Sequence, residues 1–351
     1  MHHERRLPRY LAFAYALLTA YACLYPMAGW RDPGISPFAF LTAPWPRYFT
    51  FADLWLNVLG YIPLGFMLAA SFSRGPSKRT VLFFMTLACI LFSASLEFTQ
   101  NYLPTRVASN VDLATNALGG FIGVLGGLRW GNIFDYGGFL DRWRRRRILS
   151  GHIGEIGLIL VGLWWLTQLE PTSTLFGTGD MRPLFDLPAA IMFSAHRFVV
   201  IESLIVSMNV LTVGLLVKRC MREPGGMLVA LVLVGGLAWR SLADYVFIIP
   251  PDPWQWATPG ALRGLMIGLT ALLIAWQLPG WLQHSLACVA LLLCTALVNI
   301  APENPFELSS MRLVHENHFL NFHGLTRLAD FLWPFLALIY LSANAAVASR
   351  R

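Results

Sequence analysis

The chain has 351 residues, of which 56% are hydrophobic and only 13% are charged, and its mean hydropathy is +0.56. Soluble domains carry about twice that share of charged residues, so the composition excludes an ordinary soluble protein and favours an integral membrane one. The net charge of +7 does not indicate nucleic-acid binding, because the basic residues stand in short clusters between apolar runs, as they do beside membrane spans. We therefore expect no nucleic-acid partner.

Apolar runs divide the chain into about ten segments, each close to the roughly 20 residues that a transmembrane helix needs. The predicted spans are residues 10–27, 53–72, 80–100, 111–128, 148–169, 194–217, 227–249, 261–278, 282–300 and 326–347. The expected fold is therefore an all-α, polytopic transmembrane helical bundle.

Lysine and arginine are concentrated in alternate loops of this predicted bundle. Cytoplasmic loops of membrane proteins carry the excess of Lys and Arg, so both termini and the basic loop at residues 129–147 are predicted to be cytoplasmic. The loop that holds Arg106 then lies outside. The four arginines from Arg144 to Arg147 fit a topology determinant, and a site for anionic lipid headgroups is the alternative.

Polar residues recur at helical spacing on the second, third and fourth predicted spans, so that each set lines one face of its helix. A carboxylate inside a bilayer is costly unless it faces protein, water or an opposite charge. The predicted orientation brings all three faces to the outer end of the bundle, beside one loop arginine. We therefore predict one shared ligand-binding site there, formed by Asp53, Asn57, Ser93, Glu97, Gln100, Arg106, Asp112 and Asn116.

The charged members of this set also have a structural interpretation. Glu97 and Arg106 could form an ion pair that locks the third helix to the loop that follows it. Asp53 and Asp112 could cap the N-termini of their helices and face the positive end of the helix dipole. Neither interpretation excludes a site, because the same groups could form its floor.

Two asparagines and a glycine series lie deeper in the same spans. Asn57 and Asn116 are one turn below the acids, where interhelical hydrogen bonds are the alternative to ligand binding. Gly119, Gly123 and Gly127 are four residues apart. This spacing predicts close helix packing rather than phosphate binding, because no strand precedes the glycines as a nucleotide loop requires.

The polar and glycine positions follow one another in order as Asp53-x3-Asn57, Pro63-Leu64-Gly65, Ser93-x3-Glu97-x2-Gln100, Arg106 and Asp112-x3-Asn116-x2-Gly119-Gly120-x2-Gly123. Over residues 50–128 this series resembles the VanZ-like family of bacterial membrane proteins. The resemblance implies a multi-pass protein of the bacterial cytoplasmic (inner) membrane with a role in the cell envelope. It also implies a link to resistance against glycopeptide antibiotics of the teicoplanin type. We expect a VanZ-like four-helix domain at residues 1–147 and a six-helix membrane region at residues 148–351.

The C-terminal half adds polar residues of its own. Arg240 and Asp244 are four residues apart and are predicted to pair on one helix face. His315, His318 and His323 share a predicted outer loop, but no further ligand follows at a recognised spacing, so we expect no metal site. The five cysteines are scattered, mostly within apolar runs, and are expected to be free.

The sixth to eighth predicted spans weakly echo the second to fourth. Residues 241–244 mirror residues 95–97, and residues 261–264 mirror residues 117–120. An offset of four spans would make this a parallel repeat, an arrangement that occurs in transporters.

Three functions are consistent with these features. The first is an envelope protein that binds an amphiphilic or lipid-linked molecule at the outer leaflet, with membrane lipids as its other partners. The second is an intramembrane enzyme acting on an envelope lipid or polysaccharide precursor, with Glu97 or Asp112 as general base. The third is a transporter, which is favoured by the number of spans and by the weak repeat. No cofactor is expected.

Overall fold

The computed structural model describes the chain except residues 1–5, 26, 35, 46–50, 73–75, 135–136, 150–151, 171–172, 186, 188–189, 223–224, 249–250, 303–322 and 349–351. Within the described ranges the protein is helical and has no strand, although an isolated bridge pairs Ile148 with Met221. The described residues divide into two compact units, one up to Arg144 and the other from Arg145 on. They are called the N-terminal unit and the C-terminal unit below.

Each predicted span coincides with a helix. Seven described helices are long and apolar enough to cross a membrane: α1 (Arg6–Leu24), α3 (Lys78–Gln100), α4 (Asn110–Trp130), α8 (Ala195–Cys220), α9 (Gly226–Phe247), α11 (Gly280–Ile300) and α13 (His323–Ala348). Three apolar helices are shorter: α2 (Phe51–Ala70), α6 (His152–Thr167) and α10 (Pro259–Ala275). The protein is therefore a multi-span helical membrane protein, while the number of crossings and the side of each terminus stay predictions.

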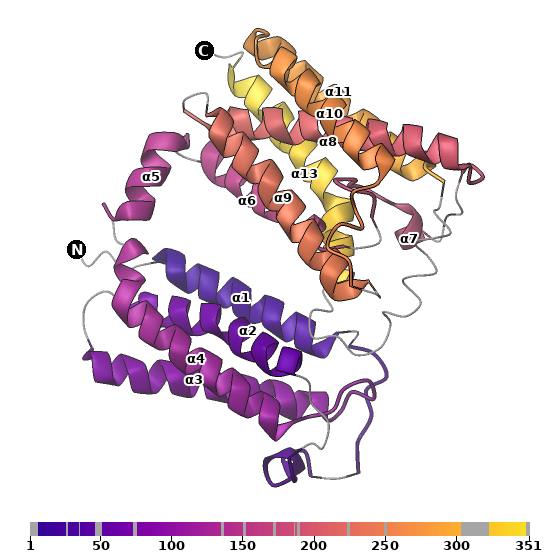
Figure 1. Cartoon of the computed structure of the whole chain (residues 1–351). Helices are drawn as coiled ribbons and strands as arrows, with labels where there is room; N and C mark the ends of the chain where they lie inside the picture. The colour runs from indigo at the N-terminus through magenta and orange to yellow at the C-terminus, as the bar shows by residue number, and fades with distance from the viewer. Residues whose placement is uncertain are drawn as a thin grey trace. The chain divides into compact units, whose positions relative to one another are not determined.

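In the N-terminal unit, α2 and α4 form the most closely packed helix pair, with α1 against α2 and α3 against α4 (Figure 1). Gly119 and Gly123 make this approach possible. A Cβ atom added to Gly119 would collide with the carbonyl oxygen of Val58, and one added to Gly123 would collide with that of Ile62. The predicted packing role of the glycine series is confirmed.

The basic loop after α4 contains a helix that the hydrophobic pattern did not predict, α5 (Phe139–Arg147). The backbone N–H of Gly137 donates a hydrogen bond of 2.8 Å to Asp141 in the first turn, which fixes the chain where the helix begins. The arginines from Arg144 to Arg147 are exposed. A solvated charged helix has no apolar periodicity, so a search for apolar runs does not find it.

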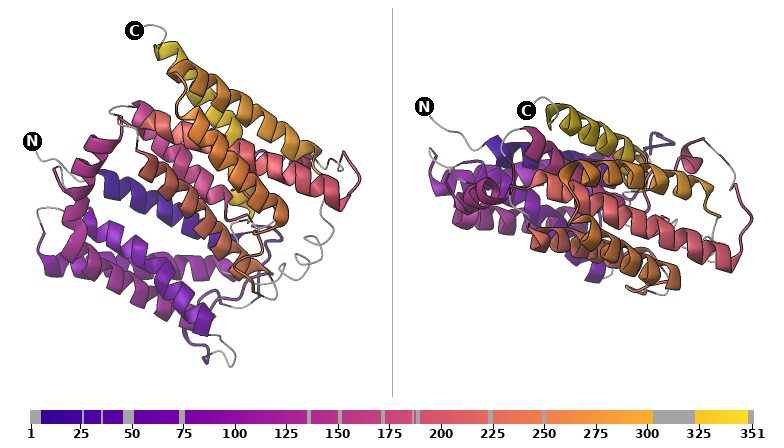
Figure 2. Two further views of the ribbon diagram at one scale, coloured as in Figure 1. Left: turned by 45° about the horizontal axis from the view of Figure 1, so that its top comes forward. Right: turned by 90° about the horizontal axis from the view of Figure 1, so that it is seen from above.

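The C-terminal unit is built around α8, the most buried of the long helices. α10 and α11 lie along α8, α6 and α9 also pack on it, and α13 packs against α6 and α11 (Figure 2). Its core includes the fully buried side chains of Val206, Val210, Leu216, Trp164 and Leu291. A helix covered on all sides in this way can carry polar side chains, because its neighbours supply their partners.

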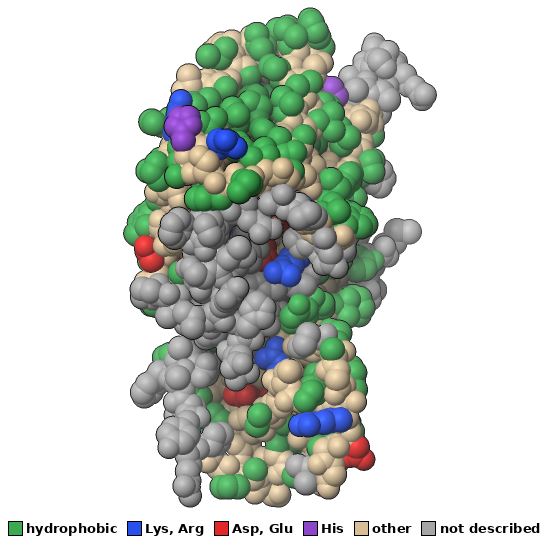
Figure 3. Space-filling view, turned by 90° about the vertical axis from the view of Figure 1, so that its right-hand side faces the viewer, with side chains coloured by type: hydrophobic (Ala, Val, Ile, Leu, Met, Phe, Trp, Pro, Cys, Tyr) green, Lys and Arg blue, Asp and Glu red, His purple; other side chains and the backbone are tan. Residues whose placement is uncertain are grey.

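The outer surface of the described helices is rich in apolar side chains. Phe83, Leu273 and Ile339 are each more than 60% exposed, and hydrophobic side chains outnumber charged ones over the face drawn in Figure 3. Exposed apolar surface on this scale is costly in water and suits contact with lipid chains.

Candidate functional site

Polar side chains from α2, α3 and α4 meet at one end of the N-terminal bundle. The Asn57 side-chain nitrogen donates a hydrogen bond of 2.9 Å to Oδ1 of Asp112, which joins α2 to α4. The Asn116 side-chain nitrogen donates one of 3.0 Å to Oγ of Ser93, which joins α4 to α3. The interhelical hydrogen bonds predicted for both asparagines are therefore confirmed.

Glu97 lies near the end of α3 and is only 3% exposed. Its Oε2 atom accepts a hydrogen bond of 2.8 Å from the backbone N–H of Ser109, at the far end of the loop between α3 and α4. Among the residues that the structure describes, none donates a hydrogen bond to the other carboxylate oxygen, Oε1. One oxygen of Glu97 thus holds the loop, and the other remains available.

Arg106 lies in the same loop but does not contact Glu97. No ion pair joins the two residues among those described, so the predicted ion-pair alternative is wrong. The guanidinium instead donates hydrogen bonds to the carbonyl oxygens of Ala22, at 3.1 Å, and Tyr25, at 3.0 and 3.3 Å. The last carbonyls of a helix lack partners within it, so Arg106 closes the end of α1. Burial there lowers the pKa of the Arg106 guanidinium from its ordinary value.

The helix cap differs from the one predicted. Ser109 is the N-cap of α4, and its Oγ atom accepts a hydrogen bond of 3.3 Å from the backbone N–H of Asp112. Asp112 stands inside the first turn, where its charge still complements the helix dipole. Gln100 donates a hydrogen bond of 3.1 Å to the carbonyl oxygen of Cys23 and so fastens α3 to α1. Asp53 is in the first turn of α2, but its side chain lies outside the described residues.

The centre of this cluster holds more acceptors than donors. The side-chain oxygens of Asn57 and Asn116 are buried and have no hydrogen-bond partner in the described part of the chain. The Oε1 atom of Glu97 is a third acceptor to which no described residue donates a hydrogen bond, since the bond from Ser109 is made to Oε2. Buried polar atoms without partners are rare in folded proteins and call for an explanation such as a bound water, ion or ligand. The arrangement can receive hydrogen bonds from a group that brings its own N–H or O–H donors.

The three histidines of the predicted outer loop, for which we expected no metal site, cannot be placed. His315 and His318 lie outside the described residues, as does the side chain of His323. Across the described ranges, no group of three or more His, Cys, Asp or Glu side chains could hold a metal ion. All five cysteines are free, as predicted.

The C-terminal unit has a polar cluster of its own around the predicted Arg240–Asp244 pair. That ion pair is present at 3.0 Å, and both side chains are buried. Arg240 also donates a hydrogen bond of 2.7 Å to the carbonyl oxygen of Glu170, beyond the end of α6. Oδ2 of Asp244 accepts a hydrogen bond of 2.9 Å from the backbone N–H of Trp256, in the loop before α10. Sequence spacing predicted the pair but not these two backbone partners.

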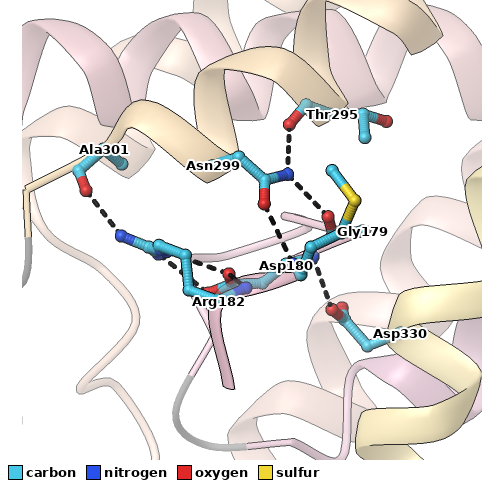
Figure 4. Close-up of polar contacts among 8 residues, drawn as sticks. Gly179, Asp180, Arg182, Thr295, Asn299, Ala301 and Asp330 are labelled. Atoms are coloured by element: carbon cyan, nitrogen blue, oxygen red, sulfur yellow. Dashed lines mark hydrogen bonds and ion pairs between the residues drawn. The ribbon is translucent and has the colours of Figure 1, made fainter. Parts of the chain in front are cut away.

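A buried loop in the C-terminal unit was predicted only as a connection between spans. Residues 175–179 are buried although they are not helical. Asn299 of α11 donates to the carbonyl oxygen of Gly179 at 2.7 Å and accepts from the backbone N–H of Met181 at 2.9 Å. Asp330 of α13 accepts from the backbone N–H of Asp180 at 3.2 Å (Figure 4). In the sequence, this burial is indicated only by the absence of charged residues from positions 173–179.

Comparison with known families agrees with the geometry of the N-terminal unit. The family model VanZ/LLP1 matches residues 12–130. This match includes most of α1, and so extends the resemblance beyond the polar and glycine positions that begin near residue 50. Comparisons with curated proteins and with solved structures found no match. Residues 12–130 thus match the VanZ/LLP1 family, and the chain continues beyond them with a further helical unit.

Proposed function

We propose that the N-terminal unit binds the polar part of an amphiphilic or lipid-linked envelope molecule where α2, α3 and α4 meet. The observation that carries this proposal is the pair of buried amide oxygens, on Asn57 and Asn116, that lack a donor among the described residues. A buried polar atom without a partner costs about 1–3 kcal/mol. A ligand that brings donors to these atoms recovers that cost on binding.

The bilayer supports an amphiphilic ligand rather than a water-soluble one. The cluster lies at one end of helices whose outer faces are apolar, so a lipid tail can rest against the helices while its headgroup reaches the polar atoms. The distribution of Lys and Arg favours the outer leaflet for this end. Among the family's associations, resistance to teicoplanin-type glycopeptides fits a protein that acts on an envelope molecule at that surface.

The predicted site residues divide into two roles in this proposal. Asn57, Glu97, Asp112 and Asn116 face the ligand as hydrogen-bond acceptors. Ser93, Gln100 and Arg106 hold α1, α3, α4 and the loop in place through the contacts described above. Asp53 is proposed as a further ligand contact at the start of α2.

Binding can be tested on the full chain purified into lipid nanodiscs. The probe is an undecaprenyl-linked disaccharide, which carries hydroxyl and amide donors, and the comparison is undecaprenyl phosphate without the sugars. Native mass spectrometry should show retention of the sugar-bearing lipid. Asn116→Leu should weaken it by about tenfold, equivalent to 1.4 kcal/mol, while Ser95→Ala on the exposed side of α3 should not. Equal retention of both lipids by all three proteins would contradict the proposal.

A catalytic role for Glu97 makes a different prediction. A buried carboxylate with one oxygen available could serve as a general base, and Glu97→Gln keeps the shape of the side chain while removing that capacity. Loss of turnover of the same lipid with retained binding would identify an enzyme. Loss of binding without any turnover in the parent protein would leave binding as the function.

A further inference from the structure

Four helices of the C-terminal unit repeat the arrangement of the N-terminal unit. α1 packs against α2 and α3, and α6 likewise packs against α8 and α9. α2 makes its closest contact with α4, and α8 does so with α10. Helices α6, α8, α9 and α10 thus follow the order and the main contacts of α1, α2, α3 and α4. The α3–α4 contact is the exception, because α9 and α10 touch little.

The glycine contacts have the same register in both units. A Cβ atom on Gly264 of α10 would lie 2.7 Å from the carbonyl oxygen of Ser203 on α8, and one on Gly268 would lie 3.0 Å from that of Ser207. Each of these four residues stands about 145 positions after its counterpart in the α2–α4 pair. Two glycines and two carbonyls at one shared offset are difficult to obtain from unrelated apolar helices.

The buried acids Glu97 and Asp244 also occupy corresponding positions in the two units. Glu97 accepts a hydrogen bond from the backbone N–H of Ser109, twelve residues later, in the loop before α4. Asp244 accepts one from the backbone N–H of Trp256, also twelve residues later, in the loop before α10. The weak sequence echo between residues 95–97 and 241–244 therefore corresponds to one structural position.

The two units differ at the residue four positions before each acid. In the C-terminal unit this residue is Arg240, and its Nε atom lies 3.0 Å from Oδ1 of Asp244. In the N-terminal unit it is the small Ser93, and Oε1 of Glu97 receives no hydrogen bond from the described residues. The C-terminal unit thus supplies an internal guanidinium to the carboxylate oxygen that the N-terminal unit leaves available.

We infer that the ligand of the N-terminal unit presents a cationic nitrogen group, a primary ammonium or a guanidinium, to Glu97. This inference rests on the proposed function and adds the chemistry of the headgroup. Both cations carry only donors, which matches the acceptor oxygens of Asn57 and Asn116. A cation also offsets the cost of a carboxylate at membrane depth. The nearby Arg106 does not do this, because its guanidinium is bonded to the end of α1.

The test uses three amphiphiles with one fluorescent acyl tail and different headgroups. One carries a primary ammonium, one a guanidinium and one a neutral N-acetyl amide. Their affinities are measured for the full chain in phosphatidylcholine nanodiscs. The unmodified protein should bind both cationic amphiphiles at least about tenfold more tightly than the neutral one. Asp252→Asn, which removes an exposed carboxylate of the C-terminal unit, serves as the control and should keep this preference.

Two variants test whether the preference for cationic headgroups depends on Glu97. Glu97→Gln keeps the acceptor for Ser109 and should bind all three headgroups equally. Ser93→Arg copies the Arg240 arrangement and should lose cationic binding, because the introduced guanidinium then occupies the carboxylate of Glu97. Should Ser93→Arg fail to fold, the isosteric Glu97→Gln still decides the question.

The outcomes separate this inference from the proposed function. Equal affinity of the unmodified protein for the three headgroups, or a cationic preference that survives in Glu97→Gln, would overturn the inference. Retention of the sugar-bearing lipid alongside either result would leave the proposed function standing. Failure of every probe to bind would end both.

Discussion

The Glu97 carboxylate and the Ser109 backbone N–H are joined by a hydrogen bond of 2.8 Å that fastens the last turn of α3 to the first turn of α4. Ser109 is also the cap of α4, and the helix it starts carries Asp112 and Asn116. The acid that faces the proposed ligand therefore also sets the position of the helix that supplies two of its neighbours. Binding and local order are coupled through one side chain.

This coupling predicts different outcomes for two substitutions at one position. Glu97→Ala removes the acceptor for the Ser109 N–H and should lower the free energy of unfolding by about 1–3 kcal/mol. Glu97→Gln keeps a carbonyl oxygen at that place and should cost less than about 1 kcal/mol. Unfolding in mixed micelles titrated with SDS measures both. A larger loss for Glu97→Gln than for Glu97→Ala would show that the hydrogen bond is not the dominant contribution.

The α2–α4 contact should be sensitive to a single methyl group. Gly123→Ala places a Cβ against the carbonyl oxygen of Ile62, so the helices must separate and the protein should lose about 1–3 kcal/mol of stability, the usual cost of overpacking. Gly60→Ala on the same pair of helices meets no atom within 4 Å and should be neutral or slightly stabilising. Yield and SDS unfolding midpoints of the two variants provide the comparison. Similar losses for both would rule out a steric origin.

Arg106 should protect the end of α1. Arg106→Lys keeps the charge but cannot form the same fork of hydrogen bonds to Ala22 and Tyr25, so this end should open more often. The thiol of Cys23 lies in that turn and is only partly exposed. Its rate of maleimide labelling, followed by mass spectrometry, should rise severalfold in Arg106→Lys. Arg31→Lys, at an exposed position, is the control and should leave the rate unchanged.

Breaking the buried pair of the C-terminal unit should be costly. Arg240→Met leaves the Asp244 carboxylate without its cation and should destabilise the protein by about 3–5 kcal/mol. Adding Asp244→Asn to this variant removes the uncompensated charge and should restore part of the loss. Thermal unfolding of the two variants tests this. A double variant less stable than Arg240→Met would show that the unpaired charge of Asp244 is not the cause of the lost stability.

The orientation of the N-terminal unit can be measured directly. α4 has 21 residues, and at 1.5 Å per residue this is about the thickness of the hydrocarbon core. Alkaline phosphatase fused after residue 108 should therefore be active, whereas a fusion after residue 148 should be inactive. An inactive fusion after residue 108 would place the Arg106 loop in the cytoplasm and would remove the outer-leaflet site.

The apolar pattern predicted the long elements to within a few residues at most ends, as in residues 80–100 against α3 (Lys78–Gln100). The result is expected, since hydrophobicity over about twenty residues decides whether a segment enters the bilayer. Helical spacing also predicted that the polar faces of α2, α3 and α4 meet. Both are local properties, because they depend only on residues that are close together in the sequence.

Contacts between distant segments could not be predicted in the same way. Arg106 donates hydrogen bonds to Ala22 and Tyr25, about eighty residues earlier. The residues next to Arg106 in the sequence do not indicate these partners. Ser109 rather than Asp112 caps α4, because Ser, Asp and Asn are comparable as caps and the choice depends on where the helix begins. The burial of residues 175–179 depends on partners on α11 and α13, more than a hundred residues later, as well as on Trp164 of α6 and Asn209 of α8.

The position of α8 has a consequence for biogenesis. This helix carries Glu202, Ser207 and Asn209, all buried, and α10 and α11, which cover it, are synthesised later. When α8 leaves the ribosome, Glu202 has not yet met Thr258, whose hydroxyl donates a hydrogen bond of 2.6 Å to Oε1 of Glu202. An isolated α8 is therefore less suited to lipid than the assembled helix. Its stable integration into the membrane therefore depends on the synthesis of α10 and α11. A nascent chain that stops before Pro259 would leave α8 uncovered and exposed to quality-control proteases.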